Sequence, residues 1–324
     1  MSGDDARMRI VVGCQPEPRA RDALVLGMLL ARQLGAKVVL AHVRPPASPG
    51  AGVGAVDAEW RAFLREETDR LLDGAQARLR DWAPELPVER AIEDNRGSGR
   101  GLARIAERHR AVLVVIGPAP GGRSARVAVG STADQLLHGS PVPVVLAPRG
   151  FADHPPPGIA RCTIAYQRET HPSGVLTCGV EFARRLRADV RLLTLVLRPV
   201  RLYSGRQHQA AEQQVLRAAR EQARQDLAAA MTEIPVPADG ETAEGADVRT
   251  ALDAVTWADD LLICASGTVG PVKRVFVGDA SHKIVRNART PVMVLPRGVR
   301  ADLWDGSRPD AGHTPPPLRP PAPP

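Results

Sequence analysis

Pro-Val-Val-Leu-Ala-Pro-Arg-Gly at residues 143–150 returns 148 positions later as Pro-Val-Met-Val-Leu-Pro-Arg-Gly at residues 291–298. The same offset aligns Ala-Val-Leu-Val-Val-Ile-Gly at 111–117 with Asp-Asp-Leu-Leu-Ile-Cys-Ala at 259–265. Short continuous apolar runs are typical of strands in a parallel sheet that is covered on both faces. An ordered series of matches at one offset indicates that a single module is written twice.

The beginnings of the two copies match at a slightly different offset. Residues 9–43 align with residues 161–195 at a shift of 152 positions, and no gap is needed. Each stretch reads as a strand, a helix with one apolar stripe, and a second strand. The middle segments diverge, as surface helices and loops commonly do.

Alternation of strands and helices predicts a parallel sheet with right-handed crossovers in each copy. We therefore predict an α/β fold of two tandem doubly wound domains, each with a five-stranded parallel sheet flanked by helices. Long helices are expected at about 57–82 and 207–231. The third strand is expected at 88–92 in copy one, and near 234–236 in copy two, where the pattern is poor.

Composition shifts mark the expected boundaries of the domains. We predict domain 1 at residues 8–150, a linker at 151–159 that contains three consecutive prolines, and domain 2 at 160–299. From residue 300 to 324 the chain is rich in Pro, Gly and polar residues, which cannot bury a core, so this tail is expected to be disordered. It offers a polyproline ligand or is a passive tail.

The overall charge allows more than one class of partner. The formal net charge is +7 and the pI is 9.9, which is compatible with nucleic-acid binding. The positive charge is nearly all arginine, however, and these arginines are interleaved with Asp and Glu, as in residues 61–67. Because no nucleic-acid motif accompanies the charge, we expect no nucleic-acid partner.

The cysteines and the chain start bear on the compartment. Cys14, Cys162, Cys178 and Cys264 are scattered, show no C-x-x-C spacing, and are expected to be buried thiols. The acidic start Met-Ser-Gly-Asp-Asp is unlike a signal peptide, and no apolar run reaches the roughly 18 residues needed to cross a bilayer. We expect a cytoplasmic protein without a membrane partner.

Ligands of doubly wound sheets bind at the carboxyl ends of the strands. In copy one, the loop that begins with Gln15 follows the first strand, and a loop from Gly117 to Thr132 follows the fourth. Glycines allow backbone amides to approach an anion, and the helix that Ser131 opens would add free N–H groups. Equally, Ser131 could be a plain helix cap and Gly130 a tight turn.

The repeat, the strand–helix pattern and the segment 117–145 resemble the universal stress protein family in its tandem two-domain form. The resemblance implies a Rossmann-like, adenine nucleotide alpha hydrolase-like fold. Nucleotide-binding members carry Gly-x-x-Gly, nine residues, and then Gly-Ser or Gly-Thr. Gly117 matches the first glycine and Gly130-Ser131 the last pair, followed by Thr132, but Pro120 replaces the second glycine and has no N–H to donate.

The resemblance implies two further ligand contacts in copy one. The family has an aspartate after strand one, where this chain has Gln15, which hydrogen-bonds a ribose less strongly than a carboxylate does. Val43 matches the backbone contact to adenine, and the preceding His42 is expected to be a strand residue rather than a catalyst. Arg123 or Arg126 can assist in holding the phosphates. The cofactor implied is ATP, bound weakly in domain 1.

Copy two departs further from the family pattern. Its glycine positions fall on Ala265 and Thr268, and the final pair becomes Gly278-Asp279. A carboxylate that faces phosphates at about 4 Å costs about 1–4 kcal/mol, depending on the local dielectric. Lys273 and Arg274 offset this only in part, so no nucleotide is expected in domain 2.

Other motifs are missing or weak in the sequence. There is no Walker A motif, no Ser/His/Asp constellation and no metal-ligand spacing. The glycines of residues 97–101 break the dinucleotide pattern and follow strand three, so a plain strand-to-helix turn is the better interpretation. His109 near a predicted helix end is expected to be solvated.

Three functions are compatible with these features. The first is a cytoplasmic stress-response protein that binds ATP weakly in copy one, with any hydrolysis slow and secondary. The second is a scaffold of the same fold whose partner is a protein. The third, an enzyme of a related nucleotide-binding class, lacks a catalytic constellation and ranks last. The similar last strands at 141–148 and 290–296 suggest a pseudo-dimer of the two copies within one chain, and a further homodimer is possible.

Overall fold

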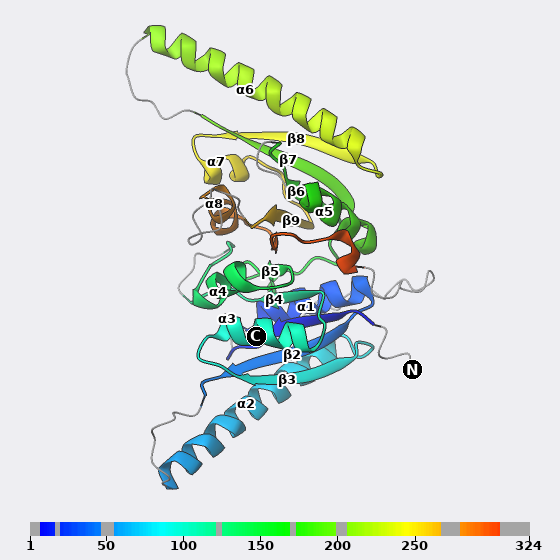
Figure 1. Ribbon diagram of the computed structural model, residues 1–324, viewed down its shortest axis with the longest axis vertical. Helices are drawn as coiled ribbons and strands as arrows, with labels where there is room; N and C mark the ends of the chain where they lie inside the picture. Colours follow the sequence, from blue (N-terminus) through cyan, green and yellow to red (C-terminus); the bar gives the residue numbers. More distant parts are fainter. Residues whose placement is uncertain are drawn as a thin grey trace. The chain divides into compact units, whose positions relative to one another are not determined.

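The duplication in the sequence is present in the fold, because the computed structural model contains two α/β units (Figure 1). The described residues up to Gly158 belong to the first unit, and the second spans Ile159–Trp304. The structure describes residues 7–16, 20–46, 55–120, 125–168, 173–198, 206–266 and 279–304. The predicted α/β class with parallel sheets is confirmed in both units.

In the first unit the apolar runs form a parallel sheet with the strand order β3-β2-β1-β4-β5. Its central strands are buried on both faces, which explains why their sequences do not alternate between apolar and polar residues. The strands are β1 (Arg9–Gly13), β2 (Lys37–Arg44), β3 (Val88–Asp94), β4 (Leu113–Ile116) and β5 (Val144–Leu146).

In the described part of the first unit, helices α1 to α4 connect the strands and lie against the sheet. Helix α2 is the longest, and only its carboxyl-terminal half places side chains such as Leu72 and Leu79 in the core. The helices are α1 (Ala20–Leu34), α2 (Ala55–Trp82), α3 (Ser98–Arg108) and α4 (Ser131–Gly139).

The second unit repeats the arrangement, with the strand order β10-β9-β6-β7-β8 and every neighbouring pair parallel. Its strands are β6 (Arg161–Ala165), β7 (Asp189–Leu197), β8 (Ala238–Gly245), β9 (Asp260–Ala265) and β10 (Val292–Leu295). The predicted third strand near 234–236 is wrong, because β8 begins at Ala238. Its sequence, Ala-Asp-Gly-Glu-Thr-Ala-Glu-Gly, carries no apolar signal, since this outermost strand is set by pairing with β7.

The helices of the second unit are α5 (Ser173–Leu186), α6 (Arg206–Glu233), α7 (Val248–Asp253) and α8 (Asp279–Asn287), followed by the 3-10 helix η1 (Ala301–Trp304). The compact second unit extends to Trp304, five residues beyond the predicted end of domain 2 at residue 299. Trp304 is fully buried, its indole N–H donates to the Cys178 carbonyl at 3.1 Å, and its ring lies 4.7 Å from that of Phe182. Residues 301–304 of the predicted tail thus form η1, and residues 305–324 lie outside the described part.

The start of the predicted linker is fastened to the first unit. The Asp22 carboxylate, at the start of α1, accepts hydrogen bonds from the backbone N–H of Gly150 at 3.1 Å and of Ala152 at 2.9 Å. Asp22 is 8% exposed and Ala152 is 1% exposed. Burial, opposed by these hydrogen bonds, raises the pKa of Asp22 above its ordinary value.

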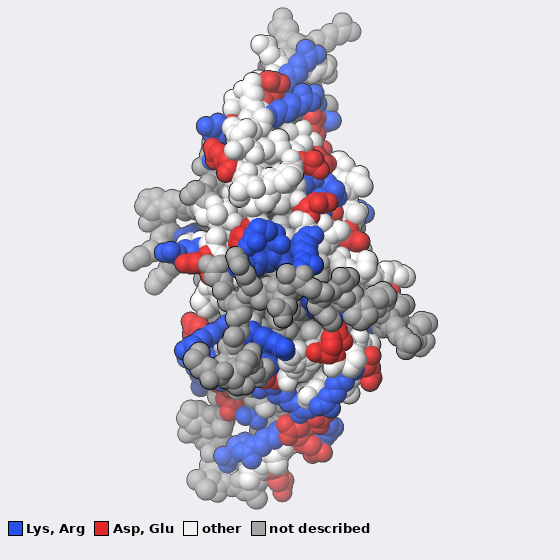
Figure 2. All heavy atoms as spheres, turned by 90° about the vertical axis from the view of Figure 1, so that its right-hand side faces the viewer, with Lys and Arg blue, Asp and Glu red and all other residues white. Residues whose placement is uncertain are grey.

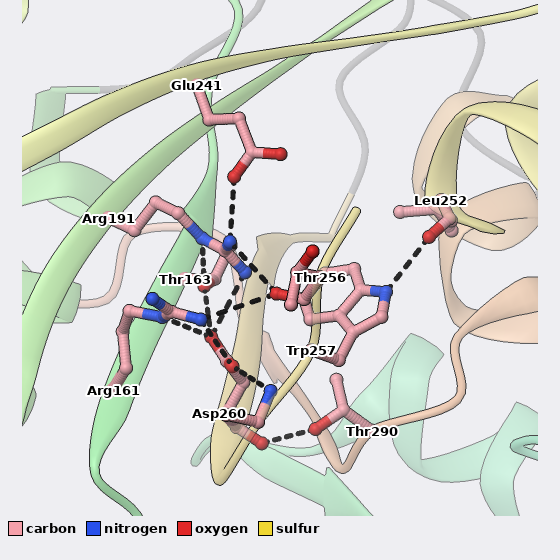
Figure 3. Close-up of polar contacts among 10 residues, drawn as sticks. Arg161, Thr163, Arg191, Glu241, Leu252, Thr256, Trp257, Asp260 and Thr290 are labelled. Atoms are coloured by element: carbon pink, nitrogen blue, oxygen red, sulfur yellow. Dashed lines mark hydrogen bonds and ion pairs between the residues drawn. The ribbon is translucent and has the colours of Figure 1, made fainter. Parts of the chain in front are cut away.

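A buried polar network lies at the amino ends of the strands of the second unit (Figure 3). The Asp260 carboxylate accepts hydrogen bonds from Arg161 at 2.8 Å, from Arg191 at 3.1 Å and from Thr163 at 2.7 Å. Arg191 also donates to Glu241 on β8 at 2.7 Å and lies over the Trp257 ring. The network thus fixes the polar strand β8 against β7.

Burial alone would raise the pKa of Asp260, because it removes the carboxylate from water. Hydrogen bonds from Arg161, Thr163 and the Ala258 N–H, together with the charge of Arg191, outweigh burial and lower that pKa below its ordinary value. The buried carboxylate is therefore held in its charged form.

The surface carries mixed charge, and Figure 2 shows acidic and basic residues largely interspersed over the face that it draws. Ion pairs account for part of this mixing, as where Glu93 contacts Arg104 at 3.4 Å and also Arg108. The four cysteines are all buried free thiols, and burial raises the pKa of Cys14 to about 12. Among the described residues, no helix combines the length and apolar character that crossing a membrane requires.

Candidate functional site

The residues singled out in copy one meet at the carboxyl edge of its sheet. Gln15 follows β1, Val43 lies in the last part of β2, and Gly117 follows β4 directly. The strand order reverses direction between β1 and β4, which is the switch point where ligands of open α/β sheets bind. Helix α4, which begins at Ser131, opens at the same edge.

The amino terminus of α4 is the part of this edge best suited to an anion. Gly130 is the N-cap residue, with φ −115° and ψ −173°, and it has no side chain with which to cap the helix. Ser131 is exposed in the first turn. Because the first N–H groups of a helix lack partners within it and carry partial positive charge, this terminus attracts a phosphate group.

Gly130 is also required by packing. A methyl group at this position would lie 2.7 Å from the Cβ of Ala119, closer than carbon atoms approach. Ala119 donates its N–H to the Ala128 carbonyl at 2.9 Å, which closes the neck of the loop between β4 and α4. Both interpretations of Gly130, as a tight turn and as part of an anion site, are therefore compatible with the structure. Residues 121–124 of this loop, Arg123 included, lie outside the described part.

Arg149, which the sequence analysis did not single out, braces the same loop. Its side chain donates to the Ala119 carbonyl at 2.5 Å, its N–H donates to the Arg126 carbonyl, and its own carbonyl accepts from Ala125. The repeated Pro-Arg-Gly ending of each copy was the signal that could have identified it. The loop is thus held from the β5 side before any ligand arrives.

The hydroxyl of Thr132 is engaged within the protein, because it shares a hydrogen bond of 2.5 Å with the Ser98 hydroxyl. The amide oxygen of Gln135 accepts from the Gly99 N–H at 3.1 Å, so α4 caps the start of α3. A methyl group at Gly99 would lie 2.5 Å from the Thr132 carbonyl oxygen. The glycines of residues 97–101 therefore permit close helix packing, which agrees with a plain strand-to-helix turn.

The backbone of Val43 faces the switch point. Alternate residues of a strand direct their N–H and C=O groups to opposite neighbours. Ala41 accepts from Cys14 on the β1 side at 2.7 Å, and Arg44 accepts from Asn95 on the β3 side at 2.9 Å. Val43 has the parity of Ala41, so its polar backbone groups point past the end of β1, where the edge of a base can reach them.

His42 closes the end of β1. Its Nδ1 lies 3.1 Å from the Cys14 carbonyl oxygen, and burial is the main cause that lowers the pKa of His42. Copy two has Thr194 at the aligned position, and its hydroxyl donates to the Tyr166 carbonyl, the counterpart of Cys14, at 2.9 Å. The same carbonyl is satisfied in both copies, which supports a role for His42 within the strand.

The corresponding edge of copy two carries a carboxylate. The N-cap of α7 is Asp247, whose side chain accepts from the Thr250 N–H at 2.7 Å, whereas α3 of copy one has Gly97 at its N-cap. Hydrogen bonds from Thr250 hold the pKa of Asp247 below its ordinary value. Ala265 ends β9, while Thr268, Lys273, Arg274, Gly278 and the side chain of Asp279 lie outside the described part.

Comparison with known proteins agrees with this geometry. The model of the universal stress protein family matches residues 6–148 and again residues 162–296. A universal stress protein of Mycobacterium tuberculosis is 32% identical over 293 residues, which cover 89% of this chain and all of that protein. A Mycobacterium bovis universal stress protein matches with the same identity and coverage.

Solved structures show the same fold. A universal stress protein from Archaeoglobus fulgidus superposes with a TM-score of 0.57 at 13% identity, over 92% of this chain and all of that one. A structure from Pseudomonas aeruginosa, described as a putative universal stress protein, gives a TM-score of 0.53 at 13% identity, over 94% of this chain and 97% of that one. This chain therefore belongs to the universal stress protein family, in its tandem two-domain form.

Proposed function

We propose that copy one binds an adenine nucleotide, such as ATP, as part of a cytoplasmic stress response. The observation that carries the proposal is the amino terminus of α4, which lies at the switch point with an exposed Ser131 and with Gly130, which has no capping side chain, at its N-cap. In this arrangement the first turn of α4 and Gly117 hold the phosphates, Gln15 faces the ribose, and the Val43 backbone meets the adenine edge.

Other members of the family support a nucleotide as the ligand. A universal stress protein of Archaeoglobus fulgidus has been solved in complex with dAMP, and another universal stress protein in complex with cAMP. The case for this chain rests on its own residues, because those structures align with less than half of it.

We expect weak binding and one site per chain. Pro118 and Pro120 supply no N–H groups to a phosphate, and neutral Gln15 stands where the family carries a carboxylate. Copy two, with Asp279 as the first residue of α8 and Asp247 at the N-cap of α7, repels an anion at the equivalent edge. Hydrolysis of ATP, where it occurs, is slow and secondary.

The test is calorimetric titration of the full chain with ATP, ADP and AMP, together with mass spectrometry of any nucleotide that denaturation releases. We expect saturable binding of one nucleotide per chain. Ser131→Asp keeps a residue suited to the first turn of a helix, but it places a carboxylate against the phosphates, so affinity should fall about tenfold or more. Asp279→Ser in copy two controls for the number of sites: Ala265 and Thr268 still replace the glycines there, so we expect the stoichiometry to stay at one nucleotide per chain.

A second candidate function, a scaffold that binds a protein, is favoured by the hydrogen bond between Thr132 and Ser98 and by the bracing of Ala119 by Arg149. These contacts complete the loop from within the protein. The absence of both released nucleotide and saturable titration would rule out the first candidate and leave the second.

A further inference from the structure

The amino-terminal half of α2 stands clear of the sheet that its other half covers. From residue 58 to residue 67 every side chain except the half-buried Leu64 is exposed, whereas Thr68, Leu72, Ala75 and Leu79 are buried. Ten residues of helix span about 15 Å. Figure 1 shows this half of α2 extending beyond the strands of its unit.

Two aromatic rings lie side by side on this half-helix. Trp60 and Phe63 stack with their centroids 5.5 Å apart and their planes 21° apart, and they remain 57% and 47% exposed. We call this pair the aromatic platform. The whole chain has only 4 Trp, 4 Phe and 2 Tyr, so two of its few aromatic side chains are placed in water. Because Trp and Phe are enriched in protein interfaces, this pair is a candidate binding surface.

The platform belongs to copy one alone. The ends of α2 and α6 correspond at an offset of 151 positions, by which the buried Leu72 and Leu79 fall on the buried Ala223 and Ala230. By the same offset, Trp60 corresponds to Ala211 and Phe63 to Gln214. The outer half of α2 is therefore not a general requirement of the fold, because the equivalent helix in copy two lacks both rings.

The chain contains a segment whose chemistry matches the platform. Residues 315–324 read Pro-Pro-Pro-Leu-Arg-Pro-Pro-Ala-Pro-Pro, with seven prolines and one arginine. Proline-rich segments favour the polyproline II conformation, which docks on exposed aromatic rings at a low entropy cost. We propose that this proline-rich segment binds the aromatic platform, with Arg319 paired to Glu59.

Glu59 is the acidic group in the right place for that pairing. It precedes Phe63 by four residues, so the two side chains share a face of the helix. No ion pair or hydrogen bond of its exposed side chain is found among the described residues, whereas Glu66 and Glu67 both pair with Arg70. The guanidinium of Arg319 would also stack on the rings as a cation–π partner.

The aromatic platform of a second protein chain is a weaker candidate for the partner that covers this platform than the proline-rich segment is. Each aromatic side chain buries about 150–250 Å² at most, so two of them give less than the roughly 800 Å² per partner of a stable interface. A segment tethered to the same polypeptide binds at a high effective concentration when its linker can span the distance to the site, and it then needs far less area.

The experiment uses the full chain labelled with 5-fluorotryptophan and observed by 19F NMR. The four tryptophan signals are assigned by single Trp→Phe variants, Trp60→Phe among them. Replacing Pro315, Pro316, Pro317, Pro320 and Pro321 by serine should shift the Trp60 signal and leave the Trp82, Trp257 and Trp304 signals in place. An unchanged Trp60 signal overturns the proposal. Dependence of the shift on protein concentration separates docking on a second copy from docking within one chain.

Charge variants test the pairing itself. Arg319→Glu and Glu59→Arg should each move the Trp60 signal by at least half of the difference between the wild type and the five-serine variant. In the double variant the signal should return to its wild-type position. Arg308→Glu in the tail and Val215→Ala on α6 are matched controls that should leave the signal unchanged. Equal effects of Arg308→Glu and Arg319→Glu would show general charge attraction and overturn the specific pairing.

Discussion

Arg191 donates a hydrogen bond from Nη2 to Oδ1 of Asp260 at 3.1 Å, and both residues are buried, at 4% and 1% exposure. The aligned positions of copy one hold Val39 and Val112, which are also buried, at 0% and 6%. Thr163 of the same network likewise aligns with Val11. The two copies therefore fill corresponding positions of their sheets differently, with apolar valines in copy one and a buried ion-pair network in copy two.

Removing the Asp260 charge should strongly destabilise the second unit. In Asp260→Asn the guanidinium of Arg191 stays buried without its carboxylate, so we expect a loss of about 3–5 kcal/mol in the free energy of unfolding. Urea unfolding followed by circular dichroism measures this for the transition of that unit. Asp302→Asn, in an exposed ion pair with Arg300, is the control and should change stability by less than about 1 kcal/mol.

The valines of copy one suggest the compensating change. The triple variant Thr163→Val, Arg191→Val and Asp260→Val should recover most of the loss, and replacement of buried ion pairs by apolar residues has raised stability by about 1–4 kcal/mol. A triple variant as unstable as Asp260→Asn in the same urea assay would contradict the equivalence of the two packings.

The contribution of Asp260 should depend on pH in one direction. Its pKa is lowered in the folded state, so its stabilising effect is complete above the ordinary value of 3.8 and is lost as the pH falls through the lower folded value. The difference in unfolding free energy between the wild type and Asp260→Asn should stay constant from about pH 5 to 8 and shrink below about pH 4. A difference that grows on acidification would show that the sign is wrong.

We expect Trp304 to be the last residue that the second domain needs for its full stability. Trp304→Ala removes a fully buried ring and should cost about 3–5 kcal/mol. A chain that ends at residue 299 should be destabilised by a similar amount, whereas a chain that ends at Asp305 should unfold at the wild-type denaturant concentration. Equal stability of the two truncated chains would place the boundary where the sequence alone suggested it.

The residues that follow α1 and α5 both have positive φ angles, so placing glycine at one and removing it from the other should have opposite effects on stability. Gly35, after α1, has φ +62°, and the aligned Arg187, after α5, has φ +55°. A residue with a Cβ pays about 1–2 kcal/mol in this left-handed region, while glycine loses about 0.5–1 kcal/mol of chain entropy on folding. Arg187→Gly should therefore stabilise by about 0.5 kcal/mol and Gly35→Ala should destabilise, both measured by thermal unfolding.

Local patterns were sufficient to predict α1, β1, β2 and the long helices, because their apolar residues recur with the periods of helix and strand. Strand β8 was misplaced because it is polar and takes its position from Arg191 and β7. Trp304 was missed because a single aromatic residue among polar neighbours has no periodicity.

Contacts between residues distant in the chain could not be read from local sequence. Asp260 binds Thr163, 97 positions away, and Thr132 binds Ser98, 34 positions away. The edge of the candidate site was predictable, since it follows from strand order, but the engagement of Thr132 and the bracing by Arg149 were not. The pairing of the two last strands stays a prediction, which distance measurements between spin labels at residues 141 and 290 can test.

The hydrogen bonds from the Gly150 and Ala152 N–H groups to Asp22 limit where the two copies can be joined in a chimeric chain. A crossover directly after Arg149 replaces Gly150, whose φ of +80° disfavours residues with a Cβ, and the buried Ala152, so the new residues present their N–H groups to the Asp22 carboxylate only if they repeat this turn. A crossover between Pro155 and Gly158 keeps that carboxylate satisfied. A chimera that combines the first copy of one relative with the second copy of another should therefore fold best when the junction follows Ala152. Residues 150–152 thus belong structurally to the first copy.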